Sequence, residues 1–591
     1  MKHSESFIGR VRSVTGSTLA IELDANIGST LPIIEGILYR VGQIGSFIKI
    51  PFGYVDLFGV VTQAGADAIP EKLIEQNGSE FGARWIKATL IGERTGKEFE
   101  RGVVQFPIAN DEAHLVSSND LMLIYGGLKE DKSIVVGNVS SSEGLPARID
   151  IDRLVNRHCA ILGSTGSGKS NTVSVVLESL ATKEGLTNSR IILIDPHGEY
   201  GEILKNHSQI FKVGANTSKG DKELYIPYWA LTFQEFIRSF PGKLNEKQEE
   251  YIREKVLEKK IKASKGIVPI SKEEAITADS PIPFSVKQLW FELDDFERQT
   301  YQERGNPETS TLDKIDVGDA ETLKSNKYTP AGNGGAAPFM NNSAQGILGF
   351  LNLMRNRLLD HRYKFLYKLD SLTPDLNGKI ESDLGQLIKD WIGSTKPITI
   401  LDLSSIPSEV MSSISGSLLS IIYEFCYWGQ DLDVGGRQTP ILFVLEEAHS
   451  YLKSGENSVS SRIVQKIAKE GRKYGAGLLL VTQRPSELDE TVLSQCGSVI
   501  ALRMTNSNDR SHIKSAVEDS LNDLVELLPS LRTGEGLIMG ECVKLPMRTK
   551  FSKAKDSKST DPLVSVQWKG DPPKDENYNK VIIGWRNNEF L

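Results

Sequence analysis

Short segments that alternate apolar and polar side chains fill the first part of the chain. Phe7–Val14 and Leu19–Leu23 show this alternation, which is typical of strands with one buried face. Further short runs of the same character lie at residues 47–50, 58–62 and 86–91. Because glycine-bearing turns separate the runs, we predict a small β-barrel over residues 1–125, followed by a linker over residues 126–148.

From about residue 149 the pattern changes to short, largely apolar runs separated by longer segments of helical character. These runs are Cys159–Leu162, Arg190–Ile194, Ile398–Leu403, Ile441–Leu445 and Gly477–Thr482. Buried strands that alternate with helices predict a mostly parallel sheet, whose functional side chains gather where the strands end. We assign this core to residues 149–546.

A long insertion interrupts the predicted core between residues 233 and 390. It holds a charged helical segment, Leu244–Lys265, and a polar stretch rich in glycine, asparagine and threonine from about residue 300 to 345. An amphipathic helix follows over Ala344–Leu359 and runs on toward Tyr367. We interpret this region as a helical insertion that carries a mobile loop.

The tail, residues 547–591, is polar except for a last apolar patch at Val581–Trp585. We expect it to act as a brace that packs on the core or on a neighbouring subunit.

The overall composition is that of an ordinary globular protein. The 591 residues, 39% hydrophobic and 25% charged, suffice for two or three domains. We find no apolar stretch near the roughly 18 residues that a membrane helix needs, and no signal-peptide core, so we expect a cytoplasmic protein.

The four cysteines lie in apolar surroundings without metal-ligand spacing, which predicts buried thiols. A net charge of −8 argues mildly against a protein that coats nucleic acid, but not against a ring with a basic channel.

A phosphate-binding motif follows the first apolar run of the core. It consists of Gly163, Ser164, Thr165, Gly166, Ser167, Gly168, Lys169 and Ser170, and the segment from Asn171 onward is helix-like. A strand, a glycine-rich loop and a helix are the context in which this motif binds a nucleotide, because backbone N–H groups and the helix start surround the phosphates. We expect Lys169 to reach the β/γ-oxygens and the Ser170 hydroxyl to bind Mg²⁺, and we count Asn171 among the nucleotide-binding residues.

Polar side chains end the other strands of the predicted sheet. Glu446 and Glu447 follow the apolar run Ile441–Leu445. We expect Glu446 to interact with Mg²⁺ through water and Glu447 to polarise the attacking water. Asp195 and Glu199 end another strand and are the alternative candidates for the catalytic carboxylate. Gln483 ends a third and is placed to contact the γ-phosphate or the water. A phosphate-binding loop, a strand that ends in two glutamates and a strand that ends in a glutamine together predict a P-loop NTPase.

Arg472 lies after a predicted helix and just before the strand that leads to Gln483. On a sheet of this type, the segment that contains Arg472 lies near the surface that contacts a neighbouring subunit. Arg472 is therefore our candidate for an arginine that stabilises the phosphoryl group transferred in the neighbour's nucleotide site. Arg484, Arg503 and Arg532 are weaker candidates.

These motifs together resemble the HerA family of hexameric ATPase motors, within the FtsK-HerA superfamily. The resemblance rests on Gly163–Ser170, Asp195–Tyr200, Glu446–His449, Glu470–Gly475 and Thr482–Pro485, in the family's order and after an N-terminal barrel. It implies that Lys169 binds phosphate, that Glu447 is the catalytic acidic residue, that Arg472 acts in trans and that Asp195 belongs to the site. The chain departs from the family at Glu446, where aspartate is usual.

The resemblance also implies a multidomain α/β fold, in which a small N-terminal β-barrel precedes a RecA-like P-loop NTPase core with a helical insertion. It implies ATP and Mg²⁺ as cofactors and a homo-hexamer with double-stranded DNA in its channel. A separate nuclease or sirtuin-like effector would dock on the barrel, in anti-phage defence or DNA-end processing. The alternative is an ATP-binding platform that assembles an effector with little movement on DNA. A conjugation or secretion motor is disfavoured, because we find no membrane anchor.

Overall fold

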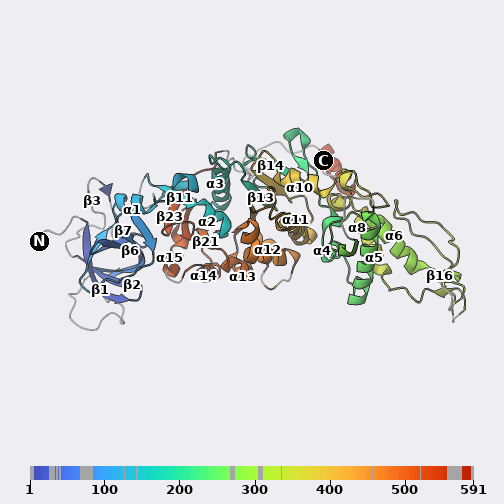
Figure 1. Cartoon of the computed structure of the whole chain (residues 1–591), viewed down its shortest axis with the longest axis horizontal. Coiled ribbons are helices and arrows are strands. Elements are labelled where there is room, and N and C mark those ends of the chain that lie inside the picture. Colours follow the sequence, from blue (N-terminus) through green and yellow to red (C-terminus); the bar gives the residue numbers. More distant parts are fainter. Residues whose placement is uncertain are drawn as a thin grey trace.

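The computed structural model describes most of the chain (Figure 1). The described residues are 6–24, 33–34, 37–38, 42–66, 84–125, 127–140, 144–265, 273–303, 310–333, 336–453, 455, 458–518, 521–555 and 575–587. The barrel lies at one end of the molecule, the core in the middle and the insertion at the other end.

A closed six-stranded β-barrel forms the N-terminal part, as predicted. The strands are β1 (Phe7–Thr15), β2 (Thr18–Leu23), β5 (Phe47–Phe52), β6 (Val55–Ala66), β7 (Arg84–Thr95) and β9 (Glu112–Leu115). They pair in the order β2-β1-β9-β5-β6-β7, and β7 pairs with β2 to close the barrel. The apolar residues Ile8, Val11 and Ile21 are buried inside it. Two further pairs extend from the barrel: β8 (Glu98–Arg101) on β7, and the short hairpin β3 (Ile33–Ile34) and β4 (Ile37–Leu38).

The last residues of the predicted barrel form a helix instead of a strand. This helix, α1 (Ser118–Tyr125), buries Leu121, Ile124 and Tyr125, a spacing that fits a helical period. The hydroxyl of Tyr125 donates to the backbone oxygen of Pro546 at 3.1 Å, so α1 joins the barrel to the core.

The barrel is also held to the core by β8. The guanidinium of Arg101 donates to the backbone oxygens of Gly540, Val543 and Lys544 at 2.6, 2.9 and 3.0 Å. The two parts therefore share an interface.

The core is built on a sheet of 12 strands. In spatial order these are β11 (Pro146–Asp150), β10 (Ser133–Val139), β23 (Met547–Phe551), β22 (Glu535–Gly540), β21 (Ser498–Leu502), β12 (Cys159–Leu162), β20 (Ala476–Thr482), β19 (Ile441–Leu445), β13 (Arg190–Asp195), β18 (Ile398–Asp402), β14 (Ser208–Lys212) and β15 (Lys222–Glu223). From β21 to β15 the strands are parallel, as predicted, and each of the central ones is fully buried.

Four antiparallel pairings extend this sheet beyond its predicted limits. Residues 126–148, expected to be a linker, contain β10 and the start of β11. The first residues of the predicted tail are β23, which pairs with β10 on one side and β22 on the other. The pairing of β10 with β23 could not be predicted locally, because these two strands lie about 400 residues apart along the chain.

Helices cover the sheet on both sides (Figure 1). They are α2 (Ile151–Asn156), α3 (Lys169–Ala181), α11 (Ser408–Trp428), α12 (Val459–Glu470), α13 (Glu490–Ser494), α14 (Ser507–Ala516) and α15 (Asn522–Val525). Among the described residues α11 is long and apolar enough to span a membrane, which corrects the expectation that no such stretch exists. It packs in the core, where Leu418, Leu419 and Ile422 are fully buried.

The insertion is helical, and it packs around an aromatic cluster that includes Tyr228, Phe236, Phe284 and Tyr367. Its helices are α4 (Phe233–Arg238), α5 (Glu246–Ser264), α6 (Val286–Arg298), α8 (Leu348–Leu359), α9 (Lys364–Tyr367) and α10 (Leu384–Ile392).

Helix α8 begins four residues later than predicted, because a buried carboxylate takes the preceding N–H groups. Glu297 accepts from the backbone of Gln345, Gly346 and Ile347 at 2.6, 3.0 and 3.1 Å. Such a carboxylate at a helix start satisfies donors that the helix cannot.

The polar stretch of the insertion runs between two short strands, β16 (Thr300–Tyr301) and β17 (Phe339–Met340). Its described part is anchored to α6, where Asp295 accepts from Asn326 and Tyr328 at 2.5 and 2.7 Å. Residues 304–309 and 334–335 lie outside the described residues, so the predicted mobility stays a prediction.

The chain continues after residue 574 with helix α17 (Asp575–Asn587). It exposes Tyr578, Val581 and Ile583 at its surface. Its proposed role as a brace stays a prediction, and the side chain of Trp585 lies outside the described residues.

The four cysteines are buried and unpaired, as predicted: Cys159, Cys426, Cys496 and Cys542.

Candidate nucleotide site

The glycine-rich loop connects β12 to α3 at the carboxyl edge of the parallel strands. Gly166 and Gly168 adopt φ angles of 72° and 99°, which side-chain-bearing residues rarely adopt. The Oγ atom of Ser167 is buried without a hydrogen-bond partner among the described residues. A tightly curved loop with an unsatisfied donor, leading into a helix N-terminus, fits a phosphate group.

A turn from the C-terminal part of the chain braces this loop, and the sequence did not indicate it. Gly534 donates its N–H to the backbone oxygen of Ser167 at 2.9 Å, and the Thr533 hydroxyl donates to that of Gly166 at 3.4 Å. A Cβ atom on Gly168 would lie only 3.1 Å from the backbone of Gly534, so this position of the loop favours glycine.

The side chain of Lys169 connects the loop to the acidic strand end. Its Nζ atom lies 2.7 Å from Oε1 of Glu447 and 3.1 Å from Oε1 of Glu446. The three side chains are 7%, 6% and 1% exposed, respectively. The structure therefore brings together the predicted phosphate-binding cation and both predicted carboxylates, although they are about 280 residues apart in sequence.

The two carboxylates differ in their affinity for a proton. Burial raises the pKa of Glu446 to about 7, and the charge of Glu447 acts in the same direction, against Lys169 and Tyr200. Burial also acts to raise the pKa of Glu447, but contacts with His449, Lys169 and Gln483 outweigh it and hold that pKa at about 2. Of the pair, Glu447 is the carboxylate that carries a full negative charge at neutral pH.

The backbone at Glu447 is held in an unusual conformation. Its φ angle of 46° lies in the left-handed region, which costs a residue with a side chain on the order of 1–2 kcal/mol. Two hydrogen bonds hold the turn: Tyr451 donates its hydroxyl to the backbone oxygen of Glu446 at 3.0 Å, and Ser450 donates its N–H to that of Glu447 at 2.8 Å. Strain of this kind is common where a side chain must point in one direction.

Gln483 joins the acidic residue to the phosphate loop. Its amide nitrogen donates to Oε1 of Glu447, and its amide oxygen accepts from the hydroxyl of Thr165. The predicted polar strand tip therefore lies at the site.

Asp195 is fully buried at the end of β13. Its two oxygens accept from the backbone N–H groups of Gly198 and Tyr200 at 2.9 and 3.1 Å. Burial raises its pKa to about 6. Through these two hydrogen bonds, Asp195 fixes the conformation of the turn that carries Glu199 and Tyr200.

Those two residues of the turn do reach the site. The hydroxyl of Tyr200 donates to Oε2 of Glu446 at 2.9 Å, and Glu199 accepts from the hydroxyl of Ser170 at 2.9 Å. The role of Tyr200 was missed from the sequence, although it belongs to the motif that begins at Asp195.

The side chain of Asn171 bonds to the C-terminal part of the chain, and its contact with a nucleotide stays a prediction. It donates to the backbone oxygen of Ser552 at 2.7 Å and accepts from the N–H of Ala554 at 3.0 Å. These bonds fasten residues 552–555, the segment after β23, along helix α3.

Arg472 is exposed and lies in the short turn Gly471–Tyr474 that leads into β20. That turn is at the amino end of β20, whereas Gln483 follows its carboxyl end. The seven residues of β20 span roughly 20 Å at about 3.3 Å each. Arg472 therefore lies too far away to contact the phosphate loop of its own chain.

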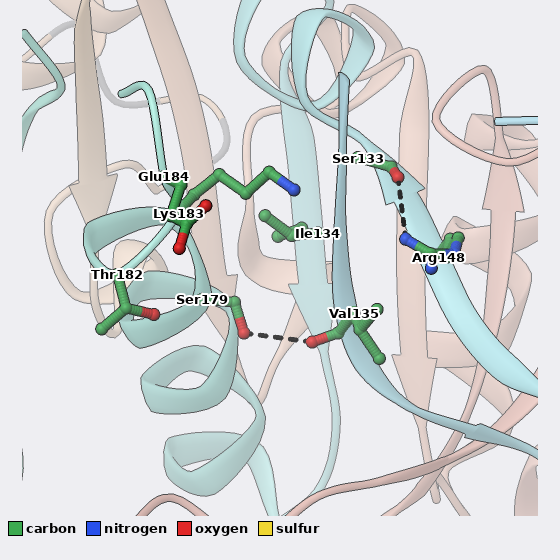
Figure 2. A pocket seen from close by; sticks show the side chains of 8 residues that line it. All are labelled: Ser133, Ile134, Val135, Arg148, Ser179, Thr182, Lys183 and Glu184. Carbon is green, nitrogen blue, oxygen red and sulfur yellow. Dashed lines mark hydrogen bonds between the residues drawn. The ribbon is translucent and has the colours of Figure 1, made fainter. Parts of the chain in front are cut away.

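A separate hollow of about 330 Å³ lies at the far end of α3 (Figure 2). Ser179, Thr182 and Lys183 of this helix end line it together with strands β10 and β11. Its cations are engaged, since Arg148 pairs with Glu130 at 2.6 Å and Lys183 donates to the backbone oxygen of the same residue. The hollow is not part of the site around Lys169.

A phosphate loop on a parallel sheet, with a lysine that contacts the acidic end of a strand two places away, defines a P-loop ATPase. Residues 134–422 match the family described as "Helicase HerA, central domain", and residues 400–542 match "Helicase HerA-like C-terminal". The chain therefore belongs to the HerA helicase family.

Individual relatives align over most of the chain. The DNA double-strand break repair helicase HerA of Saccharolobus solfataricus is 27% identical over 483 residues, which are 81% of this chain and 79% of that protein. The protein of the same name from Pyrococcus furiosus is 26% identical over 512 residues, 82% of this chain and 80% of that one.

Solved structures show a more distant likeness. VirB4 of Thermoanaerobacter pseudethanolicus covers 72% of this chain and 97% of its own at 15% identity, with a TM-score of 0.44. The conjugative coupling protein TrwB covers 74% of this chain and 94% of its own at 11% identity, with a TM-score of 0.41.

Proposed function

We propose that this ATPase is a ring-shaped motor that hydrolyses ATP to move double-stranded DNA and that it works with a separate effector enzyme. The observation that supports hydrolysis most directly is the contact of Lys169 with Glu447 at 2.7 Å, because it places a phosphate-binding cation beside an ionised carboxylate.

Glu447 is our candidate for the general base. Its Oε1 atom is engaged by Lys169 and Gln483, whereas Oε2 forms no in-line hydrogen bond among the described residues. Oε2, which lies 3.1 Å from Nδ1 of His449, is our candidate for the oxygen that accepts a proton from water. Once Lys169 turns toward a phosphate, Glu447 loses one of the contacts that lower its pKa, so its basicity rises when nucleotide is bound.

The residues around the loop fit a nucleotide with Mg²⁺. The backbone of Gly163–Ser170 would hold the phosphates, and the hydroxyl of Ser170 with the carboxylate of Glu446 would hold the metal, with Glu199 beside them. Hydroxyl and carboxylate oxygens are the ligands that this ion prefers. Mg²⁺ supplies charge neutralisation on the phosphate oxygens. Asp195 acts as a positioning group, since it shapes the turn that carries Glu199 and Tyr200.

Arg472 would complete the site of a neighbouring copy. It is exposed at the opposite edge of the sheet from its own loop, so only a second subunit can use it at a phosphoryl group. A closed ring, which the family resemblance suggests to be a hexamer, supplies such a neighbour to every site.

The relatives from Saccharolobus solfataricus and Pyrococcus furiosus are named as helicases of DNA double-strand break repair. We infer that duplex DNA lies in the channel of the ring in this protein too. On the resemblance alone, we propose a nuclease or sirtuin-like effector on the barrel, a cytoplasmic location, and a role in DNA-end processing or anti-phage defence.

The barrel can be tested as the docking surface for the effector. Every candidate catalytic residue lies beyond Gly163, so the barrel is available for contact with a partner. Removal of the barrel should abolish co-purification with the product of a neighbouring gene while nucleotide binding persists. Unchanged binding of that partner would place its docking surface elsewhere.

DNA dependence tests the motor itself. Duplex DNA should stimulate hydrolysis, with little sequence preference, and its affinity should fall steeply as salt rises, because phosphate contacts release counterions. A hydrolysis rate that is insensitive to DNA, with no binding at low salt, would favour an ATP-binding platform over a translocase.

A further inference from the structure

His449 lies against the oxygen of Glu447 that we assign to the proton transfer. Its Nδ1 atom is 3.1 Å from Oε2 of Glu447 and 3.0 Å from the hydroxyl oxygen of Thr482. The imidazole side chain is 18% exposed, whereas Glu447 and Thr482 are buried. The motif that contains Glu447 also supplies this histidine, and no role in the site described so far uses it.

Thr482 is a fixed point at the end of β20. Its backbone oxygen accepts from Gly163 at 3.3 Å, and its hydroxyl accepts from the N–H of Arg484 at 3.0 Å. The hydroxyl is therefore held in place from the strand side, and it determines how the imidazole ring of His449 is turned.

The charge of Glu447 determines which ring nitrogen of His449 carries the proton. A bare nitrogen lone pair 3.1 Å from a carboxylate oxygen would be repelled, whereas an N–H group there is attracted. The arrangement therefore favours a proton on Nδ1. In this form the Nδ1–H group points at the hydroxyl oxygen of Thr482 and donates to it. The partial positive charge of the same group also attracts Oε2 of Glu447, 3.1 Å from Nδ1.

We propose that His449 is a positioning residue for hydrolysis: held by Thr482, it fixes the rotation of the Glu447 carboxylate so that Oε2 faces the attacking water. The inference rests on the proposed role of Glu447 as the base. Two contacts hold Oε1, from Lys169 and Gln483, and the contact with His449 holds the second oxygen. Because Lys169 must leave for a phosphate, His449 and Gln483 alone orient the carboxylate in the nucleotide-bound state.

The position of the two ring nitrogens gives a matched set of variants. The side-chain amide of asparagine occupies the place of Nδ1, whereas that of glutamine reaches the place of Nε2. His449→Asn should therefore retain most of the turnover, and His449→Gln and His449→Ala should lose it. We expect a loss of at least about tenfold in kcat, less than the roughly 10²-fold expected for removing the base itself.

The effect should be confined to kcat. His449 contacts neither Lys169 nor the backbone of the phosphate loop among the described residues, so the Kd of a fluorescent ATP analogue should stay within about twofold of the wild-type value. Thr482→Val should reproduce the loss, because it removes the hydroxyl that orients the ring, and Thr482→Ser should restore it.

A double variant separates positioning from a general structural role. When Glu447→Gln has already removed the base, His449→Ala should cause no further loss of kcat, because residues that act as a unit are not additive. A further tenfold loss in that background, or equal activities of His449→Asn and His449→Ala, would overturn the proposal. Full turnover in His449→Ala would overturn the proposed role of His449 and leave the proposed ATPase motor standing. Absence of turnover in the wild-type protein would overturn both.

Discussion

At the scale of single residues, the contrast between the two neighbouring glutamates carries the functional argument. Both contact Lys169. Glu446 is fully buried and bonded to Tyr200, and burial raises its pKa, whereas the polar groups around Glu447 lower its pKa and favour its ionised form. The sequence predicted the pair and their roles from the apolar run that they follow. It could not predict the left-handed backbone of Glu447, since that conformation depends on the bond from Tyr451.

The variant Glu447→Gln tests the assignment of the base. The amide keeps the size of the side chain and its bond to Lys169 but cannot take a proton, so nucleotide should bind normally while kcat falls roughly 10²-fold or more. Steady-state hydrolysis and equilibrium binding of an ATP analogue measure the two effects. If Glu199→Gln abolishes turnover and Glu447→Gln does not, the base is Glu199.

The buried Asp195 predicts a pH-dependent stability. Burial raises its pKa to about 6, above the ordinary value of 3.8, so the folded state binds the proton more tightly than the unfolded state. Its contribution to stability is therefore fully present below about pH 4 and is lost as pH rises through 6. The shift of about 2 units corresponds to roughly 3 kcal/mol at most.

Denaturant unfolding of wild type and Asp195→Asn at several pH values checks this expectation. The difference in the free energy of unfolding between them should shrink as pH rises from 4.5 to 7.5, because only the wild type loses stability in that range. A constant difference across these pH values would show that folding does not raise the pKa of Asp195.

At the scale of secondary-structure elements, the parallel strands were predictable and the antiparallel ones were not. The runs that became β12, β13, β19 and β20 are apolar throughout and end in polar motifs, so both their burial and their chemistry are visible locally. By contrast β10 and β23 pair with each other although about 400 residues separate them along the chain. The bonds of Asn171 could not be predicted for a similar reason, because residues 552–555 return from the C-terminal part of the chain.

Two truncations test the revised boundary of the core. Deletion of residues 547–591 removes β23 from between β10 and β22 and should prevent folding, since it leaves two strands without their partner. Deletion of residues 556–591 keeps β23 and its bonds to α3 and should leave nucleotide binding intact. Circular dichroism and nucleotide binding compare the two. A folded protein that lacks residues 547–591 would contradict the observed sheet order.

The turn that carries Arg472 predicts complementation between subunits. Arg472→Ala leaves the loop intact, and Lys169→Ala leaves the arginine intact, so mixed assemblies contain some interfaces with both groups. Hydrolysis in mixtures should exceed that of either variant alone. Absence of rescue in assemblies shown by mass to be mixed would contradict an action of Arg472 across the interface.

At the scale of the whole molecule, the barrel, core and insertion follow one another along its length (Figure 1). The interface around Arg101 and Tyr125 holds the barrel to the same antiparallel strands that brace the phosphate loop through Gly534. The barrel and the phosphate loop therefore both contact the C-terminal part of the sheet, at residues 540–546 and 533–534 respectively.

The most direct test of the central claim is the rate of ATP hydrolysis by the purified full-length chain, with and without duplex DNA, beside Lys169→Ala. We predict Mg²⁺-dependent turnover that DNA stimulates and that Lys169→Ala loses almost entirely, because the variant lacks the cation that contacts Glu447 and that we propose binds the phosphates. Wild-type turnover retained in Lys169→Ala, in a preparation free of other ATPases, would contradict the assignment of the site.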